Sequence, residues 1–146
     1  MPATFDQLGL RFEYPDNWTM DSAEDIETNQ QVVVSSPHTA FWQVSKHPSG
    51  TELEPLFDEA LAALRSEYNE IEVDPADELV EGHLLTGFSV SFFYLDLLNT
   101  CWLRGIETPT ANYLVICQAE DREFAELELV FRAMLASVIR NLDPPV

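Results

Sequence analysis

The feature that most constrains the fold of this chain is the pair of segments at its two ends. Residues 8–14 alternate apolar and polar side chains, and a proline turn at 15–17 leads to Trp18, which predicts a strand, a turn and a return into the core. Residues 121–142 carry apolar side chains at helical spacing and predict a long amphipathic helix. Such a helix must cover its apolar side, and a sheet that begins with this strand provides the natural partner.

The segments between the two ends predict more strands and one further helix. Strands are expected at 31–35, 40–46, 70–74, 84–95, 100–107 and 112–119, a helix at 54–68, and a polar loop at 22–29. The helix has two competing starts, Thr51 with Glu54 as a capping box or Pro55 as the first helical residue. The order of strands, helix, strands, helix predicts one α+β domain over residues 1–146, an antiparallel β-sheet flanked by helices in an α/β/α sandwich.

The charge balance excludes two classes of partner. The chain has 26 acidic residues and 7 lysines and arginines, a formal net charge of −19, so nucleic acids and anionic membranes are disfavoured. The sequence shows neither a signal-peptide pattern nor a run of about 20 apolar residues, so we expect a cytoplasmic protein. A basic protein partner is the positive expectation, with the chain itself a monomer or a weak homodimer.

The two cysteines, Cys101 and Cys117, fall in neighbouring predicted strands. If these strands form a hairpin about Pro109, the two residues lie nearly opposite each other, and a disulfide is geometrically conceivable. In a reducing compartment we expect two free, buried thiols instead.

An apolar patch is predicted near the hairpin between the two central strands. The sequence places two leucines within residues 96–99, where the aspartate and asparagine at either end indicate a turn. Exposed leucines at a turn indicate a surface that something covers. The predicted partner-binding residues are Phe93, Leu97, Leu98 and Trp102. The alternative is that the strands extend further and both leucines pack into the core.

A run of carboxylates forms the second candidate surface. The predicted acidic surface comprises Glu70, Glu72, Asp74, Asp77 and Glu78. It would attract a basic partner, or it would only keep an edge strand from pairing with other sheets. The run lacks the spacing of a calcium-binding loop, and no metal site is predicted.

No catalytic group or cofactor site is predicted. The histidines, His38, His47 and His83, share no metal-ligand spacing with one another or with the cysteines. Neither a nucleophile elbow nor a phosphate-binding glycine loop occurs. We therefore expect a protein that is not an enzyme.

The ordered motifs resemble the PsbP/DcrB-like superfamily, which includes the photosystem extrinsic subunit PsbP, a Ran-binding nuclear-import factor and many bacterial proteins without assigned function. The matching residues are Phe12, Tyr14, Pro15 and Trp18 at the start, Gly82 and Gly87 in the middle, and Ala119, Glu120, Phe124, Phe131, Leu135 and Ser137 at the end. The resemblance implies the α+β sandwich more strongly than any one function.

Three roles are consistent with this resemblance. The first is a non-enzymatic protein-binding or adaptor domain. The second is a domain that binds or retains a small ligand or cation, as the photosystem subunit does. The third is a chaperone of type VI secretion effectors, because one bacterial branch of similar length has that role.

Overall fold

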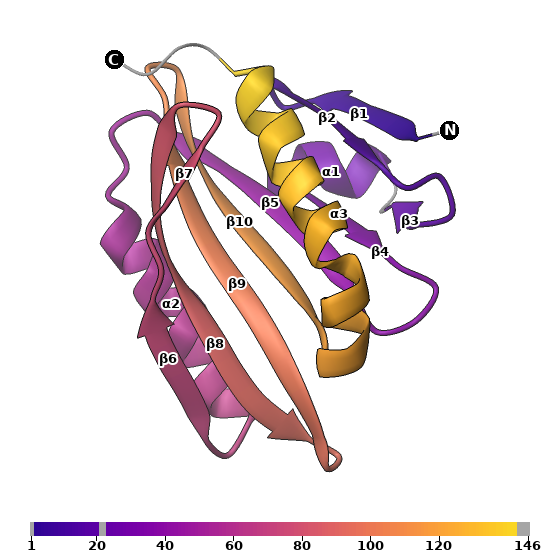
Figure 1. The fold of residues 1–146 in the computed structure, drawn as a ribbon. Helices are drawn as coiled ribbons and strands as arrows, with labels where there is room; N and C mark the ends of the chain where they lie inside the picture. The colour runs from indigo at the N-terminus through magenta and orange to yellow at the C-terminus, as the bar shows by residue number, and fades with distance from the viewer. Residues whose placement is uncertain (1, 21–22, 143–146) are drawn as a thin grey trace.

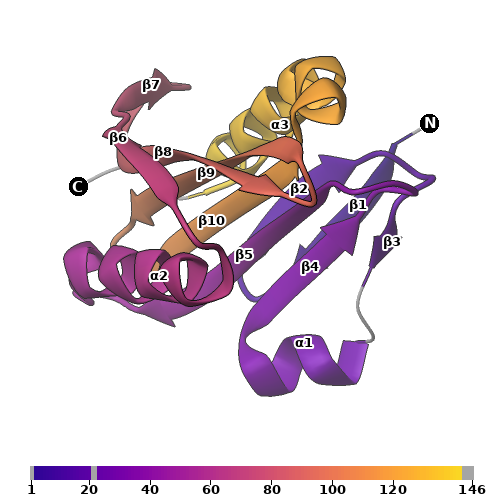
Figure 2. The ribbon, with the colours of Figure 1, turned by 90° about the horizontal axis from the view of Figure 1, so that it is seen from below.

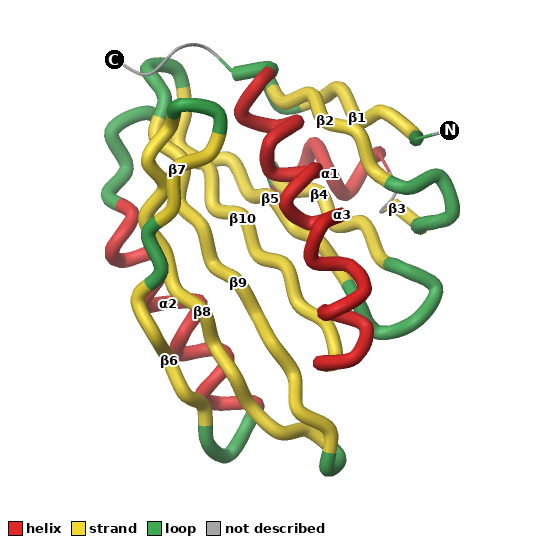
Figure 3. The backbone as a smooth tube through the Cα atoms, viewed as in Figure 1, coloured by secondary structure: helices red, strands yellow, loops and turns green. Residues whose placement is uncertain are grey.

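The computed structural model describes residues 2–20 and 23–142. Its strands are β1 (Ala3–Gln7), β2 (Leu10–Tyr14), β3 (Thr19–Met20), β4 (Gln31–Ser35), β5 (Phe41–Pro48), β6 (Ile71–Pro75), β7 (Glu78–Val80), β8 (His83–Tyr94), β9 (Leu97–Glu107) and β10 (Ala111–Glu120). Its helices are α1 (Ala23–Asn29), α2 (Leu53–Glu67) and α3 (Asp121–Arg140). Figure 1 and Figure 3 show them arranged around one twisted sheet.

The main sheet is antiparallel throughout, with the strand order β3-β4-β5-β10-β9-β8-β6. Strand β7 pairs with the other end of β8, and β1 and β2 form a separate hairpin. Figure 2 shows α3 on one face of the sheet and α2 on the other. The predicted sandwich of an antiparallel sheet between helices is therefore confirmed.

Each face of the sheet has its own apolar core. On the α3 face, Trp42 and Phe131 are fully buried with the rings of the β1–β2 hairpin, including Phe12. On the α2 face, Phe57 and Leu61 pack against β8 and β9. Burying one such large side chain contributes about 1.5–3 kcal/mol, so both helices are fixed mainly by their apolar faces.

The strand predicted over residues 8–14 is wrong at its start. Leu8 and Gly9 form a two-residue turn with φ of 60° and 72°, and the chain before them is a strand, β1. Positive φ at both turn residues matches the twist of the paired strands. Because Leu8 keeps the alternation of β2 in phase, the sequence pattern concealed this turn.

Two predictions about helices also need correction. Residues 23–29, predicted as a loop, form α1, whose Ile26 is buried in the core; Ser22 lies outside the described residues. Helix α2 begins at Leu53 after Glu52, whose side chain makes no capping bond, so neither predicted start is right. The hydroxyl of Thr51 donates to the Pro48 carbonyl instead (2.6 Å).

The long C-terminal helix is confirmed as α3, and a carboxylate caps its first turn. The side chain of Glu120 accepts from the amides of Arg122 (3.1 Å) and Glu123 (3.3 Å). These bonds satisfy two of the amides that a helix start leaves without partners.

The two cysteines are free and buried, as predicted, but their expected juxtaposition is wrong. Cys117 pairs with Trp102 across the β9–β10 ladder, whereas Cys101 pairs with Gln118. This offset of one residue places the two thiols on opposite faces of the sheet, in different cores. A disulfide between them would require a change of register.

Candidate functional site

The β8–β9 hairpin ends in apolar side chains that are exposed or, in the case of Leu98, partly buried, and we name them the apolar tip: Phe93, Tyr94, Leu95, Leu97 and Leu98. Phe93 and Leu98 lie on the α3 side of the sheet, and Tyr94 and Leu97 lie on the α2 side. Phe93 is 68% exposed, Leu95 77% and Leu97 41%. The tip lies at the far end of the longest hairpin of the sheet (Figure 1). Large apolar side chains gathered at one exposed position indicate an interaction surface, because singly scattered ones are common and grouped ones are not.

The turn at the apolar tip has an unusual sequence for its geometry. Leu95 and Asp96 have φ of 52° and 65° and join the paired residues Tyr94 and Leu97. Two-residue turns of this kind favour Asn-Gly, because a leucine side chain is strained at positive φ. Here a leucine takes the strained position and glycine is absent.

Two other hairpins in the described residues show what such turns look like elsewhere in this chain. The turns Leu8–Gly9 and Glu81–Gly82 also have positive φ at both positions, and each has glycine second. Leu8 packs partly buried against the core, which compensates for its strain. Glu81 is exposed but lies 3.6 Å from the guanidinium of Arg140, whereas Leu95 has neither burial nor an ion pair to compensate for its strain.

The tip lies at a different place from the predicted turn, and one predicted member does not belong to it. The turn is Leu95–Asp96, not 96–99, so β9 begins three residues earlier than expected, whereas β8 has the expected length and is shifted by one residue. Trp102 is only 7% exposed and packs edge-on against Phe124 of α3, with ring centroids 4.9 Å apart. It is a core residue, because α3 covers this part of β9.

Trp102 also supports a cluster of charges on the α3 face. The guanidinium of Arg104, which is 4% exposed, lies 5.1 Å from its ring centroid, and that of Arg132 lies 4.8 Å away. Glu78 bonds both arginines, at 2.8 Å and 3.0 Å. The cluster ties β7 to β9 and α3.

Glu78 therefore does not belong to the predicted acidic surface. This side chain is half-buried and ion-paired, whereas Glu70, Glu72, Asp74 and Asp77 are exposed. Burial alone would raise the pKa of Glu78, but the hydrogen bonds and charges of its two arginines outweigh it and hold the pKa below the usual value. Glu78 is thus ionised and internally neutralised.

Beside the tip, part of the sheet is left uncovered on the α3 side. Cross-strand pairing aligns Glu72 with Ser91 and Thr100, and Asp74 with Ser89, all on the same side as Phe93. We name these six residues the open face; none of them is buried. In Figure 1 this stretch of β6, β8 and β9 is covered by neither α3 nor β7.

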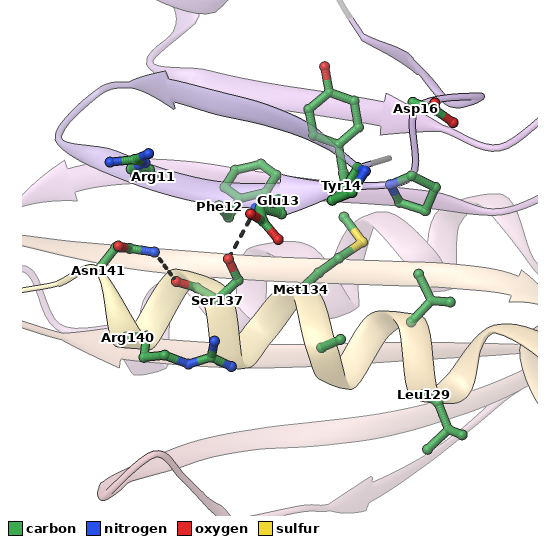
Figure 4. A pocket seen from close by; sticks show the side chains of 14 residues that line it. Arg11, Phe12, Glu13, Tyr14, Asp16, Leu129, Met134, Ser137, Arg140 and Asn141 are labelled. Atoms are coloured by element: carbon green, nitrogen blue, oxygen red, sulfur yellow. Dashed lines mark hydrogen bonds between the residues drawn. The ribbon is translucent and has the colours of Figure 1, made fainter.

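A groove of about 830 Å³ lies between β2 and α3 (Figure 4). The amide of Glu13 donates to the Ser137 hydroxyl (3.0 Å) and so ties the strand to the helix. Arg11 and Arg140 line the groove, as does Leu129, which is 77% exposed. The groove was not predicted, because it depends on where α3 crosses the hairpin.

The histidines and cysteines of the described residues lie apart from the apolar tip. The described residues include no group of three or more histidines, cysteines and carboxylates suited to a metal ion. His83 is buried beside a cavity of about 500 Å³, and its ring nitrogens have no hydrogen-bond partner within the described chain. Burial raises the pKa of Cys101 to about 12, so its thiol is protonated at neutral pH.

Sequence reasoning identified Phe93, Leu97 and Leu98 of the tip but missed Tyr94 and Leu95. The signal was present: an apolar pair directly before Asp96, where a two-residue turn would place them at the end of the hairpin.

No helix in the described part of the chain is long and apolar enough to span a membrane.

Comparisons with known proteins give structural likeness without a sequence match. Neither a family model nor a curated protein matches the sequence. A Pseudomonas aeruginosa protein of unknown function, described as a putative regulator, is 12% identical, covers 99% of both chains and has a TM-score of 0.57. A Bacteroides thetaiotaomicron protein is 12% identical with a TM-score of 0.61, covering 92% of this chain and 46% of its own.

The third similar structure is a PsbP protein. It is the cyanobacterial PsbP (CyanoP) of Synechocystis sp., 9% identical over 94% of this chain and 89% of its own, with a TM-score of 0.61. At these identities the likeness concerns the fold alone. The resemblance inferred from the sequence is thus confirmed at the level of architecture: the chain has the PsbP-like α+β fold.

Proposed function

We propose that this chain is a non-enzymatic protein-binding domain that engages its partner through the apolar tip. The observation that carries the proposal is Leu95, an exposed leucine held at positive φ in a turn that favours asparagine or glycine. Uncompensated backbone strain is common at functional sites, which supports a role for this side chain. The neighbouring rings and leucines supply the apolar centre that protein interfaces need.

The charge around the tip favours a basic partner. Asp96 lies in the turn itself, Glu72 lies on β6, the strand next to β8, and Glu70 lies directly before β6; all three are exposed. In a chain with a net charge of −19, these acids would accelerate association with a positively charged surface and repel an acidic one. Binding of this kind weakens as salt screens the charges.

The proposal is tested by photo-crosslinking in the cells that make the protein. A benzophenone amino acid replaces Leu95 in one variant and Leu129 in another. Leu129 is the matched control for Leu95, because both side chains are 77% exposed but Leu129 lies on α3, at the groove.

We expect one stoichiometric adduct from position 95 and none from position 129, with the yield from 95 falling at high salt. An adduct from position 129 alone would assign binding to the groove and refute the proposal. Equal labelling at both positions, or none at 95, would also refute it.

A further inference from the structure

We infer that the open face is the binding site for one basic amphipathic helix of the partner. This helix lies along β8, with its apolar end on the apolar tip. This inference rests on the proposed function and deepens it, since it names the kind of segment bound and the residues that select it.

The open face has the dimensions of a single helix. It spans β6, β8 and β9, two inter-strand spacings, or about 10 Å, which is close to the diameter of an α-helix with side chains. From Ser89 to Phe93 it runs four residues, about 14 Å, or roughly nine residues of helix. Helix α3 limits it on one side, and the edge strand β6 limits it on the other (Figure 1).

The side chains of the open face divide by chemistry. Its floor is made of the small hydroxyl residues Ser89, Ser91 and Thr100, which leave room for an incoming backbone. At one end Phe93 pairs with Leu98 across the strands, and this is where apolar side chains of the partner would pack. The floor thus admits close approach, and the tip supplies the apolar contact.

Both margins of the open face are acidic. Glu72 and Asp74 are exposed on β6, and Asp121, also exposed, lies at the start of α3 beside Thr100, whose hydroxyl donates to it (3.4 Å). A helix with lysines or arginines on its two flanks would place them against these margins, with the long side chains reaching outward. The charge pattern therefore selects a basic occupant.

A helix suits this surface better than an added strand. The main-chain hydrogen-bonding groups of a sheet point along the sheet toward neighbouring strands, not out of its face, so an occupant of the face is read by side chains alone. An added strand would have to use the outer edge of β6, which ends in Pro75 and carries acids that discourage pairing.

The test uses a fluorescein-labelled peptide of 16 residues in which leucines at one end and alanines along the rest form one helical face, and lysines form the flanks. Its affinity for the full chain is measured by anisotropy at low salt. A second peptide of the same composition alternates its apolar residues with lysine, as a strand would. The protein variants are Glu72→Lys with Asp74→Lys, and the control Asp58→Lys with Glu59→Lys, which makes the same charge change on α2, on the other face.

We expect the helical peptide to bind more tightly than the alternating one, and the Glu72/Asp74 variant to weaken it at least tenfold, against less than threefold for the control. Tighter binding of the alternating peptide, or equal losses in both variants, would overturn the inference. Location is checked separately with Ser91→Cys. The native thiols are buried, so the peptide should slow alkylation of this cysteine alone, and an unchanged rate would also overturn the inference.

Failure here can be distinguished from failure of the proposed function. If the peptide does not bind but position 95 still crosslinks a partner, the tip binds protein and only the helical, basic occupant is wrong. If position 95 crosslinks nothing, both are wrong.

Discussion

Replacing Leu95 by asparagine should make the protein more stable. The leucine is held at φ 52°, a conformation that costs a non-glycine residue about 1–2 kcal/mol and costs asparagine less. The side chain is 77% exposed, so its removal forfeits little apolar burial. We therefore expect a gain of about 1 kcal/mol in the free energy of unfolding, or about 2–4 °C in Tm for a domain of this size.

The assay is urea unfolding followed by tryptophan fluorescence, with Leu8→Asn as the matched control. Leu8 occupies the same position of the same kind of turn, at φ 60°, but packs against the core. Asparagine there relieves strain and loses apolar contact, so we expect no gain or a net loss.

Two results would refute this reasoning. If Leu95→Asn destabilises the monomer, Leu95 makes contacts that its exposure does not reveal. If both variants gain equally, the packing of Leu8 does not offset its strain, and the contrast on which the proposed function depends disappears.

Glu78→Ala should lower the free energy of unfolding by about 3 kcal/mol, because it leaves the buried Arg104 of β9 without its carboxylate. Glu128→Ala breaks an exposed pair and should cost less than about 0.5 kcal/mol; thermal unfolding of the two variants measures the difference. Because folding lowers the pKa of Glu78, this carboxylate contributes its full stabilisation above its ordinary pKa of 4.5 and loses it as the pH falls through the lower pKa of the folded state. The free energies of unfolding of Glu78→Ala and Glu128→Ala should therefore converge in acid and not in base. Thiol titration should detect neither Cys101 nor Cys117 in the native protein and both after denaturation; rapid native labelling would contradict their burial. Gly87→Ala should prevent stable folding, because the added carbon would lie 2.0 Å from a carbonyl oxygen of β9, and a variant with native Tm would show that the two strands are not so close.

The strands of the seven-strand order β3-β4-β5-β10-β9-β8-β6 and the two long helices could be predicted because their patterns are local. Periodicity alone indicates α3, and a run of three valines, which favour strands, indicates β4. The short helix α1 could not be found in this way, because only Ile26 of its seven residues is an apolar residue larger than alanine. Strand β1 was missed because Leu8 continues the alternation of β2 through a turn.

The candidate site was predicted in part, for a different reason. The apolar sequence around Phe93 marks the hairpin whatever the tertiary structure, so the tip could be anticipated. Trp102 and Glu78 were misplaced because their surroundings are set by distant segments. Helix α3 covers Trp102, and Glu78 meets an arginine 26 residues further along the chain. No local pattern contains that information.

The measurement that tests the central claim most directly is the affinity of the crosslinked partner for wild-type protein and for Leu95→Asn, with Tm determined on the same samples. If the strain at Leu95 serves binding, the variant will melt at a higher temperature and bind at least tenfold more weakly. A variant that is more stable and binds as well as wild type would contradict the claim that the apolar tip is the binding site.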